Sequence, residues 1–218
     1  KYTFIFDSAY SITKPTRVGY VFDKFTYNDD IVLNPSGTWS IAENIEIKAN
    51  WIANADTKYI VNHYTENLDG KGYTKVDTDN HTGYSDSSIT VNANTYEGFT
   101  AQTASQKIRI AADGSTVVDF YYTRNSYTIS FVTNGGNYIG SRTYKYEQQI
   151  PSTLKATRNG YTFACWYSDE KQTTLFDKMP AKDQNVYAYY SEETKASFFT
   201  YKISSQKVTI TKGNGLSG

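Results

Sequence analysis

Two stretches of ten residues in this chain repeat one another. TRVGYVFDKF (16–25) and TRNGYTFACW (157–166) share Thr, Arg, Gly, an aromatic residue and Phe at matching positions. Each stretch is followed by a segment that ends in an aromatic residue, IEIKANW (45–51) after the first and NVYAYY (185–190) after the second. Because internal repeats are the signature of chains built from similar units, this duplication predicts small tandem modules.

Composition and alternation predict that these modules are built from β-strands. The chain contains 21 Tyr and 11 Phe but one Met, and aromatic side chains favour the pleated surface of a sheet. Strand-like runs occur at 44–51, 107–112, 117–123, 127–133 and 185–190. We find no long helical apolar stripe, so we expect a mainly β fold with a minor helical part, limited to short turns near 169–176 and 191–196.

Two Asp-Gly dipeptides predict tight turns between strands. Asp69-Gly70 lies between KYIVNHYT and GYTKVDT, and Asp113-Gly114 lies between the runs at 107–112 and 117–123. Asp-Gly readily adopts the positive φ angles that two-residue hairpin turns need. We therefore expect a β-hairpin at each position.

Charge and cysteine content exclude several classes of protein. The 22 basic and 22 acidic residues cancel, so no overall field attracts nucleic acid or an anionic membrane. No run approaches the ~20 apolar residues that a membrane-spanning helix needs. The single cysteine, Cys165, excludes an intrachain disulfide framework and a cysteine-based metal cluster. We expect neither a nucleic-acid partner nor direct membrane insertion.

Residues that could form a catalytic or metal site are few. His63 and His81 lack the i, i+4 spacing of a helical zinc pair, and we expect them to be partly exposed imidazoles in a strand and a loop. The acidic clusters are Asp29-Asp30, Asp77-Asp79 and Asp169-Glu170. They occur in turn-rich sequence, where carboxylates are usually solvated. We predict no catalytic, cofactor-binding or metal-binding residue, and a protein that is not an enzyme.

The strand-like segment YTFACWY (161–167) contains the cysteine. Strand alternation predicts that Tyr161, Phe163 and Cys165 lie on one face and Trp166 on the other. The first copy has Lys24 where the second has Cys165, which argues against a deeply buried or nucleophilic cysteine. The predicted core aromatics are Tyr20, Phe22, Phe25, Trp51, Tyr161, Phe163 and Trp166.

The segment from Tyr127 to Tyr190 resembles the internalin-type B repeat, also called the Listeria-Bacteroides repeat. The resemblance rests on Asn134-Gly135-Gly136, on Arg158-x-Gly160-Tyr161-x-Phe163 and on Trp166-Tyr167. Cys165 stands where the pattern has Gly, and Tyr190 stands where it has a closing Trp. Over both copies the repeat signature comprises Arg17, Gly19, Tyr20, Phe22, Phe25, Trp51, Arg158, Gly160, Tyr161, Phe163, Trp166 and Tyr190.

The rest of the chain resembles related surface repeats. HYTENLDG, TYEGFTA and AADGSTVVDFYYTRN, within residues 57–125, are similar to the MucBP-like repeats, named for mucin-binding proteins. The resemblances divide the chain into a partial or degenerate B-repeat module (1–52), a MucBP-like β module (53–125), a B-repeat module (126–191), and a linker that resembles the start of a leucine-rich surface repeat (192–218).

The resemblance implies small β-grasp-like modules in an elongated array. It implies an extracellular bacterial protein, at the cell surface or secreted, in which these repeats act as a non-enzymatic stalk or spacer and in adhesion. Glycans, glycoproteins or other domains of the same protein are the implied partners. A different function stays open, that of carbohydrate-binding accessory modules of a secreted glycoside-degrading enzyme. Exposed coplanar aromatic rings would favour the second function, and buried ones the first.

Overall fold

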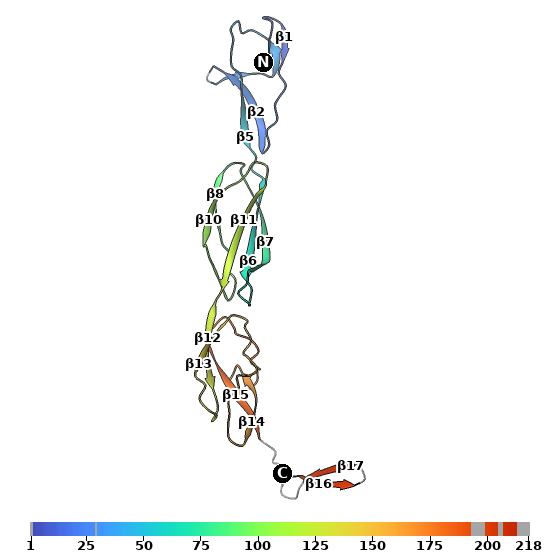
Figure 1. Cartoon of the computed structure of the whole chain (residues 1–218). Helices are drawn as coiled ribbons and strands as arrows, with labels where there is room; N and C mark the ends of the chain where they lie inside the picture. Colours follow the sequence, from blue (N-terminus) through green and yellow to red (C-terminus); the bar gives the residue numbers. More distant parts are fainter. Residues whose placement is uncertain (1, 29, 193–198, 205–206, 213–218) are drawn as a thin grey trace. The chain divides into compact units, whose positions relative to one another are not determined.

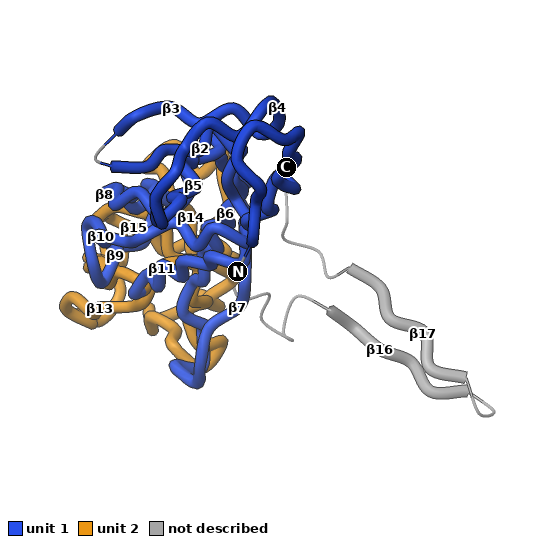
Figure 2. The backbone as a smooth tube through the Cα atoms, turned by 90° about the horizontal axis from the view of Figure 1, so that it is seen from above, with its two compact units in different colours: residues 1–123 blue, residues 124–218 orange. Residues whose placement is uncertain are grey.

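Every regular element that the structure describes is a β-strand, which confirms the mainly β fold class. The computed structural model describes residues 2–28, 30–192, 199–204 and 207–212. The chain divides into two compact units, unit 1 (residues 1–123) and unit 2 (residues 124–218) (Figure 2). Within unit 1 we call residues 2–53 the first module and residues 54–123 the second module, because each has its own apolar cluster.

The first module is built on an antiparallel sheet in which β2 is central (Figure 1). β2 (Tyr20–Tyr27) pairs with β3 (Ile31–Leu33) on one side and with β5 (Lys48–Ala53) on the other. β1 (Ala9–Ser11) and β4 (Ser36–Thr38) form a separate antiparallel pair. The buried side chains of its core are Ile12, Phe25, Leu33 and Trp39.

The second module is centred on β6. β6 (Thr57–Glu66) pairs antiparallel with β7 (Tyr73–Gly83) and parallel with β11 (Thr116–Arg124). β9 (Phe99–Ala101) completes the strand order β7-β6-β11-β9, and β8 (Ser88–Asn92) pairs with β10 (Ser105–Arg109). Its buried core contains Tyr59, Val61, Val91, Ile110, Val118, Phe120 and Tyr122.

The two predicted Asp-Gly hairpins have different outcomes. Asp69-Gly70 joins β6 to β7, which pair antiparallel, so the first hairpin is confirmed. Asp113-Gly114 also turns the chain, but β10 and β11 belong to different sheets, so the second hairpin is wrong. β11 buries Phe120 beside β6, and such burial outweighs a local turn preference.

Unit 2 contains a four-stranded mixed sheet with the order β13-β12-β15-β14 (Figure 1). Its strands are β12 (Ser126–Val132), β13 (Ser141–Lys145), β14 (Tyr161–Tyr167) and β15 (Gln184–Glu192). β12 and β15 pair in parallel, while β13 and β14 pair antiparallel with them at the two edges. The first and last strands of this sheet therefore lie side by side at its centre.

The remaining described strands form one antiparallel pair, β16 (Phe199–Ser204) and β17 (Lys207–Lys212). Residues 193–198, 205–206 and 213–218 lie outside the described residues. They include most of the helical turn predicted near 191–196 and part of the predicted linker and leucine-rich start at 192–218.

Residues 169–176 form bends and turns, and the predicted short helical turn is absent there. The Asp169 carboxylate accepts the backbone N–H groups of Thr173 and Thr174, the latter at 2.8 Å. These hydrogen bonds lower the pKa of Asp169 below its usual value. Asp side chains compete in this way with helical hydrogen bonds, which explains the loop.

A β-bulge in β14 changes which side chains reach the core. Phe163 faces Tyr190 in the ladder, but Cys165 already faces Tyr189, so β14 has one extra residue there. As a result the rings of Phe163 and Trp166 pack together, with centroids 5.1 Å apart. The prediction that these two residues lie on opposite faces is therefore wrong, because a bulge interrupts strand alternation.

Trp166 lies in the core of unit 2, where 6% of its surface is exposed. Its indole N–H donates to the Leu154 carbonyl at 3.0 Å, and its ring meets Phe131 with centroids 4.9 Å apart. The other buried members of this core are Ile129, Phe131, Tyr144, Ala156, Met179, Val186 and Ala188. Among the other predicted core aromatics, Phe25 is buried, while Tyr20, Phe22, Trp51, Tyr161 and Phe163 are half-buried.

Trp166→Ala should destabilise unit 2 by about 3 to 5 kcal/mol, because it leaves a cavity and removes the partner of the Leu154 carbonyl. Amide hydrogen exchange of β12 and β15 in the full chain measures this loss, with unit 1 as internal reference. Cys165→Ser is the matched control, since the half-buried thiol should change stability by less than about 0.5 kcal/mol. Unchanged hydrogen exchange in Trp166→Ala would contradict the placement of the Trp166 indole in the core of unit 2.

Candidate functional site at the junction of the first and second modules

The site begins with the tight turn of the first repeat copy. Gly19 has a φ of 76°, a conformation that glycine adopts freely, and the Tyr20 N–H donates to the Arg17 carbonyl at 3.1 Å. This turn lays the Arg17 guanidinium over the Tyr20 ring, 3.8 Å from the centroid. Contact between a cation and a ring face is attractive, so it orients both side chains.

Asp86 of the second module contacts this turn. The Tyr20 hydroxyl donates to Asp86 Oδ2 at 2.6 Å, and the Arg17 guanidinium lies 4.0 Å from the same oxygen. The Arg109 guanidinium lies 3.1 Å from Asp86 Oδ1. The hydrogen bond to Asp86 raises the pKa of Tyr20 above its usual value. We call Arg17, Tyr20, Asp86 and Arg109 the junction cluster.

Backbone contacts hold the same junction. The Asn54 N–H donates to the Gly19 carbonyl, and the Ser85 N–H donates to the Asn54 carbonyl, each at 2.9 Å. A Cβ added to Gly19 would clash with the Ala112 carbonyl oxygen. Gly19 therefore provides both a positive φ and room for the second module.

The second repeat copy has the same turn without this neighbour. The Arg158 guanidinium lies 4.0 Å from the centroid of the Tyr161 ring, and Gly160 has a φ of 78°. A Cβ added to Gly160 would meet no atom within 4 Å. The stacked turn is therefore common to both copies, whereas the contact with Asp86 requires the second module.

The aromatic signature residues after each turn brace the sheets. Phe22 meets Trp51 edge to face, with centroids 5.9 Å apart, and Phe163 meets Tyr190 in the same way at 6.0 Å. The Tyr190 hydroxyl also donates to the Thr133 carbonyl at 2.7 Å. Tyr190 therefore occupies the place of the closing Trp51 and adds a hydrogen bond to the loop after β12.

The prediction that His63 is partly exposed is wrong, because its side chain is fully buried. His63 Nδ1 lies 2.7 Å from the Tyr122 hydroxyl, and Nε2 lies 3.1 Å from Asp79 Oδ2. The Asn94 amide donates to the same Asp79 oxygen at 3.0 Å. This hydrogen bond is the main cause that lowers the pKa of Asp79, and the hydrogen bond with His63 lowers it further. Burial raises the pKa of Tyr122 to about 12. The network holds strands together inside the second module.

His81 lies on β7 and not in a loop, and its exposed ring stacks on Tyr59 with centroids 5.2 Å apart. Among the residues that the structure describes, no group of three or more His, Cys, Asp or Glu side chains could hold a metal ion. The predicted absence of catalytic, cofactor-binding and metal-binding residues stays a prediction.

Unit 2 has an ion cluster of its own at Glu147. The Arg124 guanidinium is nearly buried and lies 2.8 Å from Glu147 Oε2, while Lys178 lies 3.3 Å from Oε1. Arg124 also donates to the Tyr146 carbonyl at 2.9 Å. The hydrogen bond from Arg124 is the main cause that lowers the pKa of Glu147. Glu147 pairs with both cations, and these contacts lie within unit 2, which suits a structural role.

The partners of the signature turn could not be predicted from the sequence. Asp86 and Arg109 are far from Arg17 along the chain, and no spacing links them. Strand alternation could have predicted the burial of His63. It lies on the same face of β6 as Val61 and Thr65, which are also buried.

Comparison with known proteins supports the repeat type. Residues 127–189 match the model of the Listeria-Bacteroides repeat domain. The chain is similar to Internalin H of Listeria monocytogenes, at 30% identity over 128 residues, which covers 48% of this chain and 23% of that protein. It is also similar to a protein of Evansella cellulosilytica named "Putative membrane protein", at 30% identity over 70 residues, or 31% of this chain and 10% of that protein. The chain spans less than a quarter of the length of either relative.

The family match confirms the predicted resemblance to the Listeria-Bacteroides repeat over residues 127–189. The resemblance of residues 57–125 to MucBP-like repeats stays a prediction. In the part of the chain that the structure describes, no helix has the length and apolar character needed to cross a bilayer.

Gly19→Ala and Gly160→Ala separate the effect of contact with the second module from the effect of the turn conformation itself. Both variants force a side chain into a left-handed conformation, which costs roughly 1 to 2 kcal/mol, but only Gly19→Ala also pushes a Cβ against Ala112. We expect faster hydrogen exchange at the Asn54 and Ser85 amides in Gly19→Ala alone, measured by NMR on the full chain. Equal effects of the two variants would contradict this account of the junction.

Proposed function

We propose that this chain is part of the repeat region of a bacterial surface protein and acts there as a non-enzymatic stalk or spacer. The repeat match over residues 127–189 and the similarity to Internalin H support a surface-protein repeat. The predicted modules 1–52, 53–125 and 126–191 belong to this proposal.

The observation that best supports a stalk is the parallel pairing of first and last strands. In the second module, residues 59–65 of β6 pair with 116–122 of β11. In unit 2, residues 129–132 of β12 pair with 184–187 of β15. Tension on the two ends of such a module pulls these strands in opposite directions along their length. The hydrogen bonds of the ladder then share the load, so the module resists extension.

The junction cluster supports the same role within unit 1. Asp86 is held from three directions, by Tyr20, Arg17 and Arg109, and the Asn54 backbone adds a hydrogen bond beside it. A pivot of the first module against the second would break these contacts together. Surface ion pairs are individually weak, at about 0–1 kcal/mol, but a network with backbone contacts restrains rotation more than one pair does.

Pulling in two directions tests the load-bearing pair. Handles on Asp56→Cys and Thr123→Cys, in a Cys165→Ser background, load the β6–β11 ladder along its strands. Handles on Asp56→Cys and Tyr84→Cys instead open the β6–β7 hairpin one pair at a time. We expect single-molecule force spectroscopy to give a clearly higher unfolding force for the first geometry. Equal forces in the two directions would contradict the stalk proposal.

We propose that the chain also takes part in adhesion, with glycans or glycoproteins as ligands. Tyr138 and Tyr84 are 89% and 61% exposed, so both rings are accessible for stacking on a sugar. The alternative function as accessory modules of a glycoside-degrading enzyme has no comparable support. The rings of Tyr64 and Tyr121 stack on each other at 5.0 Å and 19°, so they cover one another and form no open coplanar platform.

A glycan array with the full chain tests adhesion separately from the stalk. We expect reproducible binding that falls at least tenfold in Tyr138→Ala or Tyr84→Ala, because an aromatic stacking contact is worth about 1.4 kcal/mol or tenfold in affinity. Leu175→Ala, which removes an exposed aliphatic side chain, is the matched control. An array without reproducible binding would contradict adhesion and leave the stalk proposal unaffected.

A further inference from the structure

A side-chain network in the second module brings a lysine amine to an asparagine amide. Asn62 lies on the central strand β6, on the face of the sheet that points away from the buried core, and it is 8% exposed. Its Oδ1 accepts hydrogen bonds from the Lys75 amine at 3.3 Å and from the Thr78 hydroxyl at 3.1 Å. Its Nδ2 donates to Asp119 Oδ1 at 2.8 Å. The partners come from β7 and β11, the strands on either side of β6.

The three partners fix the orientation of the Asn62 amide. A lysine amine in its charged form can only donate hydrogen bonds, and a carboxylate can only accept them. Oδ1 must therefore face Lys75, and Nδ2 must face Asp119. The amide thus presents its carbonyl to an amine and its nitrogen to a carboxylate.

A β-bulge in β7 places the lysine on this face. Asp77 and Lys75 face consecutive residues of β6, so Val76 is an extra residue between them. Lys75 and Thr78 are three residues apart, and regular alternation would place them on opposite faces of the sheet. Because the bulge interrupts this alternation, both side chains reach Asn62 from the same face.

We propose that Lys75 and Asn62 become joined by an isopeptide bond between their side chains, with Asp119 transferring the proton. Lys75 Nζ attacks Asn62 Cγ, the bond between Cγ and Nδ2 breaks, and Nδ2 leaves as ammonia. The product is a secondary amide that ties β6 to β7. The inference does not depend on the proposed stalk or adhesion function.

The neighbouring groups supply what this reaction needs. Lys75 is exposed, so its ammonium group can lose a proton to water and attack as the neutral amine. The attack places negative charge on Asn62 Oδ1, toward which the Thr78 hydroxyl donates. Asp119 accepts a proton from the attacking nitrogen and passes it to the departing Nδ2. The ammonia released takes up a proton from water, so the net charge does not change.

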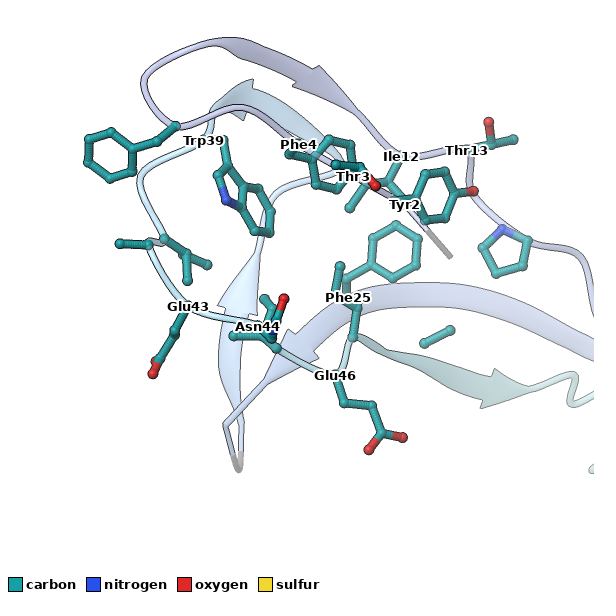
Figure 3. A pocket seen from close by; sticks show the side chains of 17 residues that line it. Tyr2, Thr3, Phe4, Ile12, Thr13, Phe25, Trp39, Glu43, Asn44 and Glu46 are labelled. Carbon is teal, nitrogen blue, oxygen red and sulfur yellow. The ribbon is translucent and has the colours of Figure 1, made fainter.

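An asparagine beside carboxylates does not suffice for this reaction. In the first module Glu43, Asn44 and Glu46 line one cavity (Figure 3). None of the described residues that line this cavity is a lysine, so no lysine amine faces the amide within it. The network around Asn62 differs because the amine, the amide and the carboxylate are in direct contact.

Mass spectrometry of the denatured full chain tests the bond. We expect a mass below that of the sequence by one ammonia. In a tryptic digest, the peptide that contains Asn62 should be joined to the peptide that contains Lys75, without cleavage after Lys75. Lys75→Arg keeps the positive charge but removes the attacking amine, so it should restore the full mass. Lys58→Arg, which changes a lysine on β6, is the matched control and should keep the loss of ammonia.

The role of Asp119 has its own variant. Asp119→Asn keeps the size of the side chain but removes the basic oxygen that transfers the proton. General acid–base catalysis is lost in this variant, so the loss of ammonia should be at least about tenfold slower. Mass spectra taken at increasing times after synthesis measure this rate. An unchanged rate would overturn the assignment of proton transfer to Asp119.

Opening the β6–β7 hairpin by force provides a second measurement. Handles on Asp56→Cys and Tyr84→Cys, in the Cys165→Ser background, pull the two strands apart from their open end. An isopeptide bond stops this opening when it reaches residue 62. The extension should therefore be shorter than in the same chain with Lys75→Arg added.

Two results would overturn the proposal. One is the full sequence mass after prolonged incubation of the folded chain at about pH 9, where more of a lysine amine is neutral than at pH 7. The other is a loss of ammonia that persists in Lys75→Arg. That result would assign the loss to cyclisation of another asparagine, such as Asn134, which precedes Gly135. Neither result affects the stalk or adhesion proposal.

Discussion

The parallel pairing of first and last strands is the constraint on which each complete sheet depends. In unit 2, Ile129 and Val186 come from β12 and β15, are both fully buried, and meet only when these strands are neighbours. β12 and β15 can pair only when the chain between them folds back and brings them together. This loop closure costs entropy, which the buried apolar surface must offset. Edge strands such as β13 and β14 then complete the core from either side.

Local features of the fold could be predicted from the sequence, and non-local ones could not. The β character and the hairpin at Asp69-Gly70 follow from residue types and short spacings. The bulge that brings Phe163 to Trp166 breaks the alternation on which strand prediction relies. The parallel pairing of β11 with β6 joins strands that are far apart in the sequence, and no local pattern indicates it.

The candidate site shows the same division. Arg17, Gly19 and Tyr20 were recognised because they recur as Arg158, Gly160 and Tyr161, and in both copies the arginine stacks on the tyrosine. The recurrence could not identify Asp86, because Asp86 contacts the first turn alone. The burial of His63 depends on Tyr122 and Asp79, which lie on different strands. A repeat signature therefore defines a module's own geometry, while its neighbours are encoded elsewhere.

Acidic side chains interrupt an apolar segment of the first module, and this bears on solubility. Apolar strand edges are templates for aggregation, and natural proteins commonly protect them with charge. Ile45 and Ile47 are half-buried, Glu46 alternates with them and Glu43 precedes them, and both glutamates are exposed. Two copies that met along residues 43–47 would bring these carboxylates together, which is unfavourable at neutral pH. The glutamates therefore disfavour self-association of the chain through this segment.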